Sequence, residues 1–216
     1  MKRYSIAKLV FLFVALGSSA ALPAAKLETV LQEVQSVWDK TKTFKAPFQQ
    51  SVESKLMGTT EQSEGLILVV KPDRFRWESK TDGTIQIINK KILTLVQPKA
   101  QRGRTVVDIY PDFAKKADAR VLDFLAGNVQ IKKLYKPKLL DQKGNFIRLE
   151  LVPLGKKEET YIAEIDKKSY LLHALSYETE ETKTRLEFQN PRANETIDEK
   201  LFEYTPGKED IVNRTN

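Results

Sequence analysis

The fold of this chain is decided by the segment Gly65-Leu66-Ile67-Leu68-Val69-Val70-Lys71-Pro72-Asp73-Arg74-Phe75-Arg76-Trp77-Glu78. Its near-continuous apolar run predicts a strand that is buried on at least one face. Pro72 ends that strand, and the strand that follows carries Phe75 and Trp77 on one side, because side chains alternate along a strand. Two large aromatic side chains placed together either complete a core or line a pocket.

The first 25 residues have the layout of a secretory signal peptide. Three basic residues among the first eight precede a short apolar run at residues 9–16, and small residues follow up to Ala25. A basic end, an apolar centre and a small-residue cleavage zone are typical of such signals, and the apolar run is too short to span a bilayer. We expect cleavage between residues 20 and 25 and export of the remaining chain.

Composition excludes several classes of protein. The chain has no cysteine, which rules out a lipid attached to an N-terminal cysteine and a disulfide framework. Removing Lys2, Arg3 and Lys8 from the 36 basic residues leaves 33 against 29 acidic residues, a net charge of +4. So small a surplus does not indicate nucleic-acid binding. We expect a soluble exported protein that folds on its own core.

Two elements after the signal are predicted from their periodicity. From Lys26 to Thr41 apolar residues recur at helical spacing, which predicts an amphipathic helix that covers another surface. Its apolar positions are Leu27, Val30, Leu31, Val34, Val37 and Trp38. From Phe44 to Leu56 the period becomes two, which predicts a long strand with one wet face. Phe44, Ala46 and Phe48 begin its apolar side.

Most of the later sequence also predicts strands. They are expected at residues 84–88, 92–96, 105–110, 146–152, 160–165, 170–177 and 184–188, with a hairpin turn at Asn89-Lys90-Lys91. A loop is predicted to begin at Gln97. The segment Ala117–Leu125 favours a second amphipathic helix that ends at Gly127-Asn128. The lysines between Lys132 and Lys138 favour a solvated loop. Antiparallel strands about ten residues apart predict a meander that closes or half-closes into a barrel. No linker divides residues 26–216, so we expect a single domain.

The residue types that carry most enzyme chemistry are scarce. His173 is the single histidine; it lies in an apolar strand pattern without a serine-nucleophile motif, and we expect a half-buried side chain with one hydrogen bond. One histidine and no cysteine do not make a zinc or copper site, and we expect no cofactor. A hydrolase that uses paired carboxylates is the alternative from another class, but solvated strand faces explain the acidic residues better. We therefore expect a binding protein, not an enzyme.

Periodicity leaves open whether the apolar faces pack tightly or enclose a site for an apolar ligand. Either arrangement removes apolar surface from water at about 25 cal/mol per Å². On the pattern alone a packed core is favoured.

Three groups of residues resemble the family of periplasmic outer-membrane lipoprotein carriers, the LolA family. They are Phe44-Lys-Ala-Pro-Phe48-Gln49-Gln50, Gly65 with Lys71-Pro72, Phe75 and Trp77, and the C-terminal set Phe188-Gln-Asn190, Asn194-Glu-Thr-Ile197-Asp198 and Phe202-Glu-Tyr204-Thr-Pro206-Gly207. The resemblance implies an α+β fold: an unclosed, half antiparallel β-barrel whose concave face is covered by amphipathic lid helices.

The resemblance also implies a function. Members carry the acyl chains of lipoproteins in an apolar cavity, from an inner-membrane ABC transporter to an outer-membrane receptor, and this implies a periplasmic location. We expect a monomer whose partners are acylated lipoproteins, the transporter and the receptor. The cavity positions implied here are Val34, Trp38, Phe44, Phe48, Phe75, Trp77, Leu122 and Leu125. The alternative is a lipid- or glycolipid-binding envelope protein, a carrier or stress sensor, on the same half-barrel.

Lys71 departs from the family pattern. The best-known members have an arginine before the proline, which holds the lid closed by hydrogen bonds. A lysine ammonium lacks the planar five-donor fork of arginine, so a clamp on helix carbonyls should be weaker or differently arranged. The resemblance therefore implies that Lys71 is a lid latch that works through a single hydrogen bond.

Overall fold

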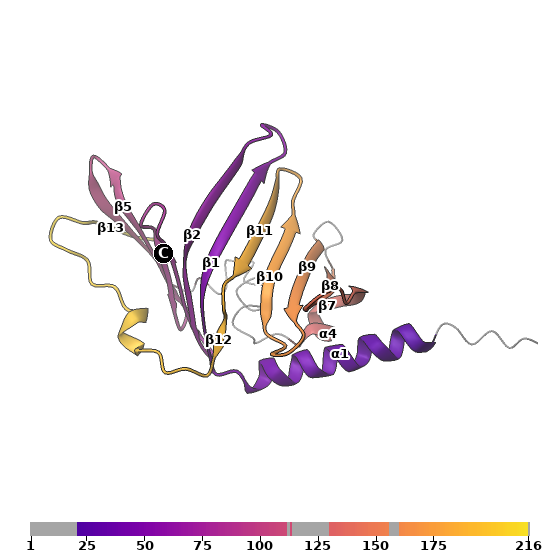
Figure 1. Ribbon diagram of the computed structural model, residues 1–216. Coiled ribbons are helices and arrows are strands. Elements are labelled where there is room, and N and C mark those ends of the chain that lie inside the picture. The colour runs from indigo at the N-terminus through magenta and orange to yellow at the C-terminus, as the bar shows by residue number, and fades with distance from the viewer. Residues whose placement is uncertain (1–20, 112, 114–129, 156–159, 216) are drawn as a thin grey trace, which may run out of the picture.

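One large sheet dominates the computed structural model, which describes residues 21–111, 113, 130–155 and 160–215 (Figure 1). Its strands are β1 (Thr43–Ser54), β2 (Thr60–Val70), β3 (Arg74–Ser79), β4 (Ile85–Asn89), β5 (Ile92–Gln101), β6 (Arg104–Tyr110), β7 (Tyr135–Asp141), β8 (Phe146–Pro153), β9 (Thr160–Asp166), β10 (Leu172–Glu178), β11 (Thr182–Phe188), β12 (Arg192–Ala193) and β13 (Ile211–Arg214). The helices are α1 (Ala21–Lys40), α4 (Ile131–Leu134) and the 3₁₀ helix η1 (Glu199–Phe202).

The sheet is open. Its strand order runs from β13 through β6 to β1 and then from β11 to β7, and among the described residues the two end strands do not pair with each other. All neighbours along this path are antiparallel except β13, which is parallel to β6. The predicted half-barrel is confirmed. It consists of two meanders, β1–β6 and β7–β11, which are joined where β1 pairs with β11.

The helix-covered face of the sheet, called here the inner face, holds the main core. In β1 the alternating residues Phe44, Ala46 and Phe48 are buried, as the period of two predicts. Helix α1 lies across one end of the strands and adds Val34 and Trp38 to the same cluster. The amphipathic segment is stabilised as a helix because its apolar side packs against the apolar side of β1 and the neighbouring strands.

A smaller core lies on the opposite, outer face over the first meander. Leu68 of β2 and Ile87 of β4 are buried there against Phe202, which the C-terminal segment brings back across the sheet. Arg76 Nη1 donates to Leu201 O at 3.0 Å and Asn89 Nδ2 donates to Phe202 O at 3.2 Å, so side chains of the sheet hold this segment in place. The run Leu66–Val70 is near-continuously apolar because both of its faces are covered.

The prediction of a loop beginning at Gln97 is wrong. Strand β5 continues to Gln101 and returns as β6 after a tight turn at Arg102-Gly103, where both residues have positive φ. Pro98, which suggested a loop, is tolerated because the pairing with β4 has ended at Val96. The shift in register between Gln97 and Gln101 marks a bulge.

The lysine-rich segment between Lys132 and Lys138 is also not a loop. It forms α4 and β7, the edge strand of the second meander. Lysines and Pro137 suit an edge because they leave no continuous row of free donors for another chain to pair with. Its inward residues, Tyr135 and Leu139, belong to the main core.

Two smaller differences concern element ends. Helix α1 begins at Ala21, not near Lys26, and Pro23 is compatible with that start because the first turn of a helix needs no N–H donors. Strand β1 ends at Ser54, so Leu56 lies in the turn that follows. The second helix expected at Ala117–Leu125 lies outside the described residues.

Gly65 allows the centre of the sheet to pack closely. Phe48 of β1 is opposite Gly65 of β2, and a Cβ added to Gly65 would lie 1.9 Å from Glu78 O and 2.7 Å from the Phe48 ring. The absent side chain therefore leaves room for the Phe48 ring, whose centroid lies 3.8 Å from that of Trp77. Only glycine fits here without movement of a neighbouring strand.

We predict that Gly65→Ala lowers the free energy of unfolding by about 3 kcal/mol or more, because the methyl group would press on a backbone oxygen that cannot rotate away. Urea unfolding followed by tryptophan fluorescence measures this. Gly207→Ala is the matched control, since its Cβ would meet only the Asp210 carboxylate at ordinary contact distances of 3.6 Å and above. Equal stability of the two variants would contradict the close approach.

Candidate functional site

Six of the eight predicted cavity residues lie together on the inner face. Val34, Trp38, Phe44, Phe48 and Phe75 are buried, with at most 4% of each exposed, and Trp77 is half-buried against the same cluster. Leu122 and Leu125 lie outside the described residues.

Strand register brings the aromatic residues together. Phe44 pairs with Val69, which in turn pairs with Phe75, so the three side chains form a row across β1, β2 and β3. The Phe44 ring stacks on Trp38 of α1 at a centroid distance of 6.1 Å and meets the edge of Phe188 at 5.7 Å. Aromatic contacts thus link the helix, the first meander and the second meander.

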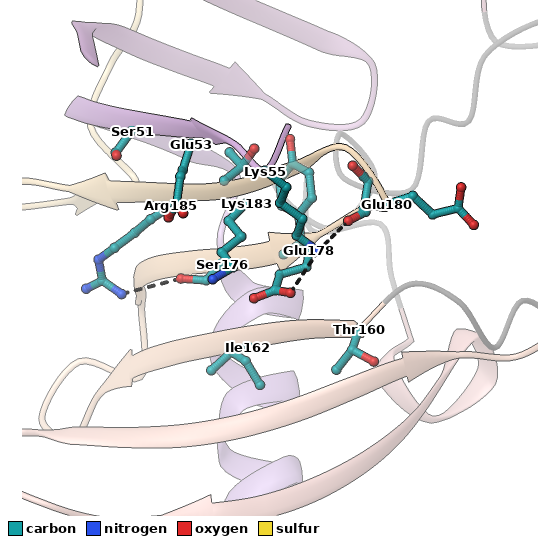
Figure 2. Close-up of a pocket in the computed structure, with 13 residues that line it drawn as sticks. Ser51, Glu53, Lys55, Thr160, Ile162, Ser176, Glu178, Glu180, Lys183 and Arg185 are labelled. Atoms are coloured by element: carbon teal, nitrogen blue, oxygen red, sulfur yellow. Dashed lines mark hydrogen bonds and ion pairs between the residues drawn. The ribbon is translucent and has the colours of Figure 1, made fainter. Parts of the chain in front are cut away.

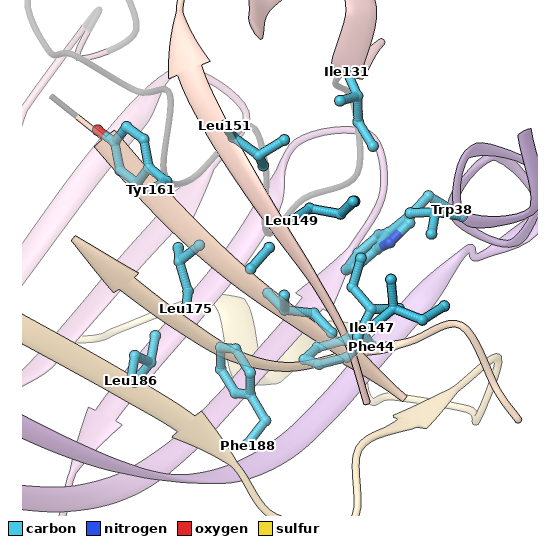
Figure 3. Packing of buried hydrophobic residues seen from close by; sticks show 14 of the residues in the cluster. Trp38, Phe44, Ile131, Ile147, Leu149, Leu151, Tyr161, Leu175, Leu186 and Phe188 are labelled. Atoms are coloured by element: carbon cyan, nitrogen blue, oxygen red, sulfur yellow. The ribbon is translucent and has the colours of Figure 1, made fainter. Parts of the chain in front are cut away.

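The second meander supplies inner-face residues that were not among the predicted cavity residues. Figure 3 shows Leu149, Leu151, Tyr161, Leu175 and Leu186 on the same side of the sheet as Phe44 and Phe188. Their alternation within strands was visible in the sequence, as in Ile147, Leu149 and Leu151. What sequence periodicity could not supply was the pairing of β1 with β11, which places these residues beside Phe44 and Phe48.

These side chains are packed against one another in this conformation. The aromatic pair of the opening segment therefore completes a core as it stands, which agrees with the expectation from the pattern alone. The inner face becomes accessible to a ligand only if a covering element moves. For the described residues that element is α1, which covers the face with Val30, Leu31, Val34 and Trp38.

The C-terminal end of α1 is held to the sheet by Lys71. The Lys71 Nζ donates a hydrogen bond to Trp38 O, and the Lys71 backbone N donates to Lys42 O at 2.9 Å. An ammonium group at a helix C-terminus also interacts favourably with the negative end of the helix dipole. Burial lowers the pKa of Lys71 below its ordinary value of 10.5, and the Asp39 carboxylate opposes that shift.

A groove of about 590 Å³ lies between α1 and α4 and reaches this cluster. Leu31 and Ile131 belong both to its lining and to the buried core. The two helices are joined across it, because Ile131 N donates to Gln35 Oε1 at 3.2 Å and Lys132 pairs with Glu28. No motif in the sequence pointed to this groove, since its two walls are about 100 residues apart in the chain.

The outer face of the second meander is polar. Arg185 Nη2 lies 3.0 Å from Glu164 Oε2 and 3.3 Å from Glu187 Oε2, and its hydrogen bond to Glu164 lowers the pKa of that carboxyl group. His173 stacks on Phe146 at a centroid distance of 4.3 Å, and 24% of its side chain is exposed. Glu164 and Glu187 are thus held in ion pairs with Arg185, an arrangement typical of a solvated sheet face.

Two further properties concern membranes and metals. Among the described residues no helix combines the length and the apolar character that crossing a bilayer requires. In the same part of the chain, no three His, Asp or Glu side chains converge as metal ligands.

An open antiparallel sheet with a helix-covered apolar inner face is the half-barrel class of fold that the resemblance implied. The family model described as "Outer membrane lipoprotein carrier protein LolA" matches residues 39–205, and this chain belongs to the LolA family.

Individual relatives are distant. The outer-membrane lipoprotein carrier protein of Chromobacterium violaceum is 24% identical over 201 residues, which cover 88% of this chain and 90% of that protein. A solved structure of an uncharacterized conserved protein from Thermus thermophilus has a TM-score of 0.51 and 14% identity over 88% of this chain and 99% of that one. A LolA superfamily protein from Nitrosomonas europaea has a TM-score of 0.41 and 8% identity, with 82% and 97% of the two chains covered. The Thermus structure supports the fold alone.

We predict that the stability of the protein relative to a Lys71→Met variant rises as the pH approaches 10.5. The folded-state pKa of Lys71 is lowered, so the penalty for burying the charged ammonium is present in full below that pKa. Between it and 10.5 the unfolded chain binds more protons than the folded chain, so the free energy of unfolding increases with pH.

Urea unfolding of both proteins over the alkaline range measures this difference. Lys91→Met, which removes an exposed lysine from the β4–β5 turn, is the control and should track the unmodified protein. A pH-independent difference for Lys71→Met would show that the ammonium is not desolvated.

Proposed function

We propose that this protein is a periplasmic chaperone that binds the acyl chains of lipoproteins on its inner face. It takes its cargo from the inner-membrane ABC transporter and delivers it to the outer-membrane receptor. The observation that carries the proposal is the continuous apolar cluster that joins α1 to both meanders and is attached at the helix end by Lys71. Membership of the LolA family and the likeness to a lipoprotein carrier support it.

The physics of the cargo requires such a face. Each CH₂ group of an acyl chain left in water is unfavourable by about 0.8 kcal/mol, so a lipoprotein cannot cross an aqueous compartment uncovered. A carrier needs apolar area for the chains and a way to give them up. An open sheet whose cover is one helix meets both needs, because the helix and the chains can replace each other on the same surface.

We assign roles to residues on this basis. Phe44, Phe48, Phe75 and Trp77 line the sheet side of the cavity that opens when α1 moves, and Val34 and Trp38 line its helix side. Leu122 and Leu125, which lie outside the described residues, are assigned to the same cavity from the family resemblance alone. Lys71 is the latch, because its hydrogen bond to Trp38 O must break before the C-terminal turn of α1 can leave the sheet.

The remaining parts of the proposal are location and state. We propose that residues 1–25 act as a signal peptide and that the mature chain, residues 26–216, is a monomeric single domain in the periplasm. It acts by binding and not by catalysis, which the scarcity of histidine and cysteine in the sequence supports.

The chain's two tryptophans provide a direct test, because Trp38 and Trp77 are both on the inner face. A synthetic triacylated lipopeptide with brominated acyl chains should quench the emission of both, since bromine quenches only at close contact. The variant Trp38→Phe keeps only Trp77, which reports the sheet side, and Trp77→Phe keeps only Trp38, which reports the helix side. Fluorescence titration measures the effect.

The controls separate the proposal from its alternative. The unbrominated lipopeptide should shift but not quench the emission, and a brominated peptide without acyl chains should do neither. Absence of quenching by the acylated peptide would contradict acyl binding on the inner face. Displacement of the lipopeptide by lipopolysaccharide or free phospholipid at lower concentration would instead favour a lipid or glycolipid carrier.

A further inference from the structure

The inner face of the sheet is not apolar over its whole length. In β11 the residues Phe188, Leu186 and Thr184 point to that face, because side chains alternate along a strand. Thr184 is the first polar residue of this series, counted from the end nearest α1. It pairs with Tyr177 of β10, which packs against the main core. In the second meander the apolar surface therefore ends in a pair of hydroxyl groups.

The two hydroxyl groups do not stabilise the fold by hydrogen bonding. Thr184 is 5% exposed and Tyr177 is half-buried, and neither side chain forms a hydrogen bond with the residues that the structure describes. Burying a hydroxyl group without a hydrogen bond is unfavourable, so most buried polar groups in proteins are paired. Valine and phenylalanine fill the same space without that cost. The two hydroxyl groups are therefore better suited to binding a ligand than to holding the sheet together.

A second polar pair continues this boundary into the first meander. Gln50 of β1 lies two residues beyond Phe48 on the same side of the strand, and it is opposite Ser63 of β2. Ser63 Oγ donates to Gln50 Oε1 at 3.2 Å, which leaves the amide group of Gln50 as a donor. Polar groups thus replace apolar ones in neighbouring rows of both meanders. We call Gln50, Ser63, Tyr177 and Thr184 the polar border of the inner face.

Polar residues on the other side of the same strands have a simpler explanation. A groove of about 680 Å³ lies on the outer face at this end of the sheet, and its polar side chains bond to one another (Figure 2). Arg185 Nη1 donates to Ser176 Oγ at 3.4 Å, and Lys55 Nζ lies 3.1 Å from Glu178 Oε2. One solvated face is ordinary for an antiparallel sheet. The polar border is on the face that packs, so solvation does not explain it.

The apolar region between the polar border and α1 is long enough for an acyl chain. From Phe44 to Val52, the residue of β1 that pairs with Thr184, the strand rises roughly 26 Å at about 3.3 Å per residue. The hydrocarbon core of a bilayer is about 30 Å thick and holds two layers of chains, so one chain reaches about 15 Å. Acyl chains that begin at the polar border therefore fit on the apolar rows of the inner face.

We infer that the polar border binds the ester carbonyl groups through which acyl chains are joined to glycerol in the cargo. Thr184 and Tyr177 each donate one hydrogen bond to a carbonyl oxygen, and the amide group of Gln50 is a third donor at the same boundary. The inference rests on the proposed function and deepens it. The inner face covers the chains and also recognises the chemical group at which they end.

This assignment has two consequences for the cargo. The acyl chains run from the polar border toward α1, so the peptide leaves at the opposite end, where the β1–β2 and β10–β11 turns lie. The site also distinguishes between linkages. A lipid whose chains are joined to glycerol by ether bonds has no carbonyl oxygen there, and it leaves the hydroxyl groups of Thr184 and Tyr177 without an acceptor. A site built for hydrogen bonds discriminates strongly against an analogue that cannot form them.

The experiment compares two synthetic triacylated lipopeptides with identical brominated chains, one with ester and one with ether bonds to glycerol. The full mature protein should bind the ester form about tenfold more tightly, measured by titration of tryptophan quenching, because hydrogen bonds to the carbonyl groups are lost in the ether form. The double variant Thr184→Val/Tyr177→Phe should bind the two forms equally. Thr160→Val is the matched control: it removes a hydroxyl group from the outer face at the same end of the sheet and should keep the preference.

A second measurement separates binding from a structural role. Thr184→Val should leave the free energy of unfolding unchanged or raise it, because a methyl group replaces a buried hydroxyl group. A clear loss of stability would show that the hydroxyl group serves the fold and would overturn the inference.

The remaining outcomes distinguish the inference from the proposed function. Equal binding of the two lipopeptides by the unmodified protein, or an ester preference that survives the double variant, would overturn the role of the polar border. Binding of neither lipopeptide would overturn the proposed function. Phosphatidylglycerol and its diether analogue then test the border alone, since an ester preference between them that the double variant abolishes would support an ester site for free lipid.

Discussion

The pairing of β1 with β11 is the contact on which the rest of the molecule depends. Each meander alone has an apolar face and two edges, and neither can cover that face by itself. At the seam, Phe48 pairs with Phe188 on one side and with Gly65 on the other, so the two large rings lie side by side and the missing side chain of Gly65 leaves room for the Phe48 ring. This packing joins the apolar faces of the two meanders into one surface under α1.

The sequence predicts the features of this arrangement that depend on neighbouring residues and misses those that depend on contacts between distant segments. The alternation of Phe44, Ala46 and Phe48 identified a strand and its buried side, and the spacing of Val34 and Trp38 identified the helix face. The run Leu66–Val70 was recognised as buried, but only the structure shows that its second face is covered by Phe202, about 130 residues later. The seam, the groove between α1 and α4 and the C-terminal cover all join distant segments, and periodicity carries no signal for such joins.

The errors share a physical cause. Lysine and proline lower the expectation of a strand, yet β7 is built from them because an edge strand must discourage further pairing. Pro98 and the charged residues around it suggested a loop, yet β5 passes through them because its neighbour β4 has already ended. In both places the residues have the low strand propensity that was assigned to them. Whether they can still form a strand depends on their position within the sheet, which the sequence pattern does not show.

The closed state implies a preference among cargoes. Burying one large apolar side chain stabilises a protein by about 1.5–3 kcal/mol, so the four side chains of α1 on the inner face are worth about 6–12 kcal/mol together. One acyl chain of about 16 carbons gains about 13 kcal/mol when it leaves water, which is close to what it must replace. A single chain therefore competes with the helix on nearly equal terms, whereas two or three chains exceed it clearly. Under the proposed function, α1 acts as an internal competitor that leaves single-chain lipids weakly bound and yields to triacylated cargo. The hydrogen bond of Lys71 adds only a modest further barrier, because the cost of desolvating its ammonium group offsets part of the bond.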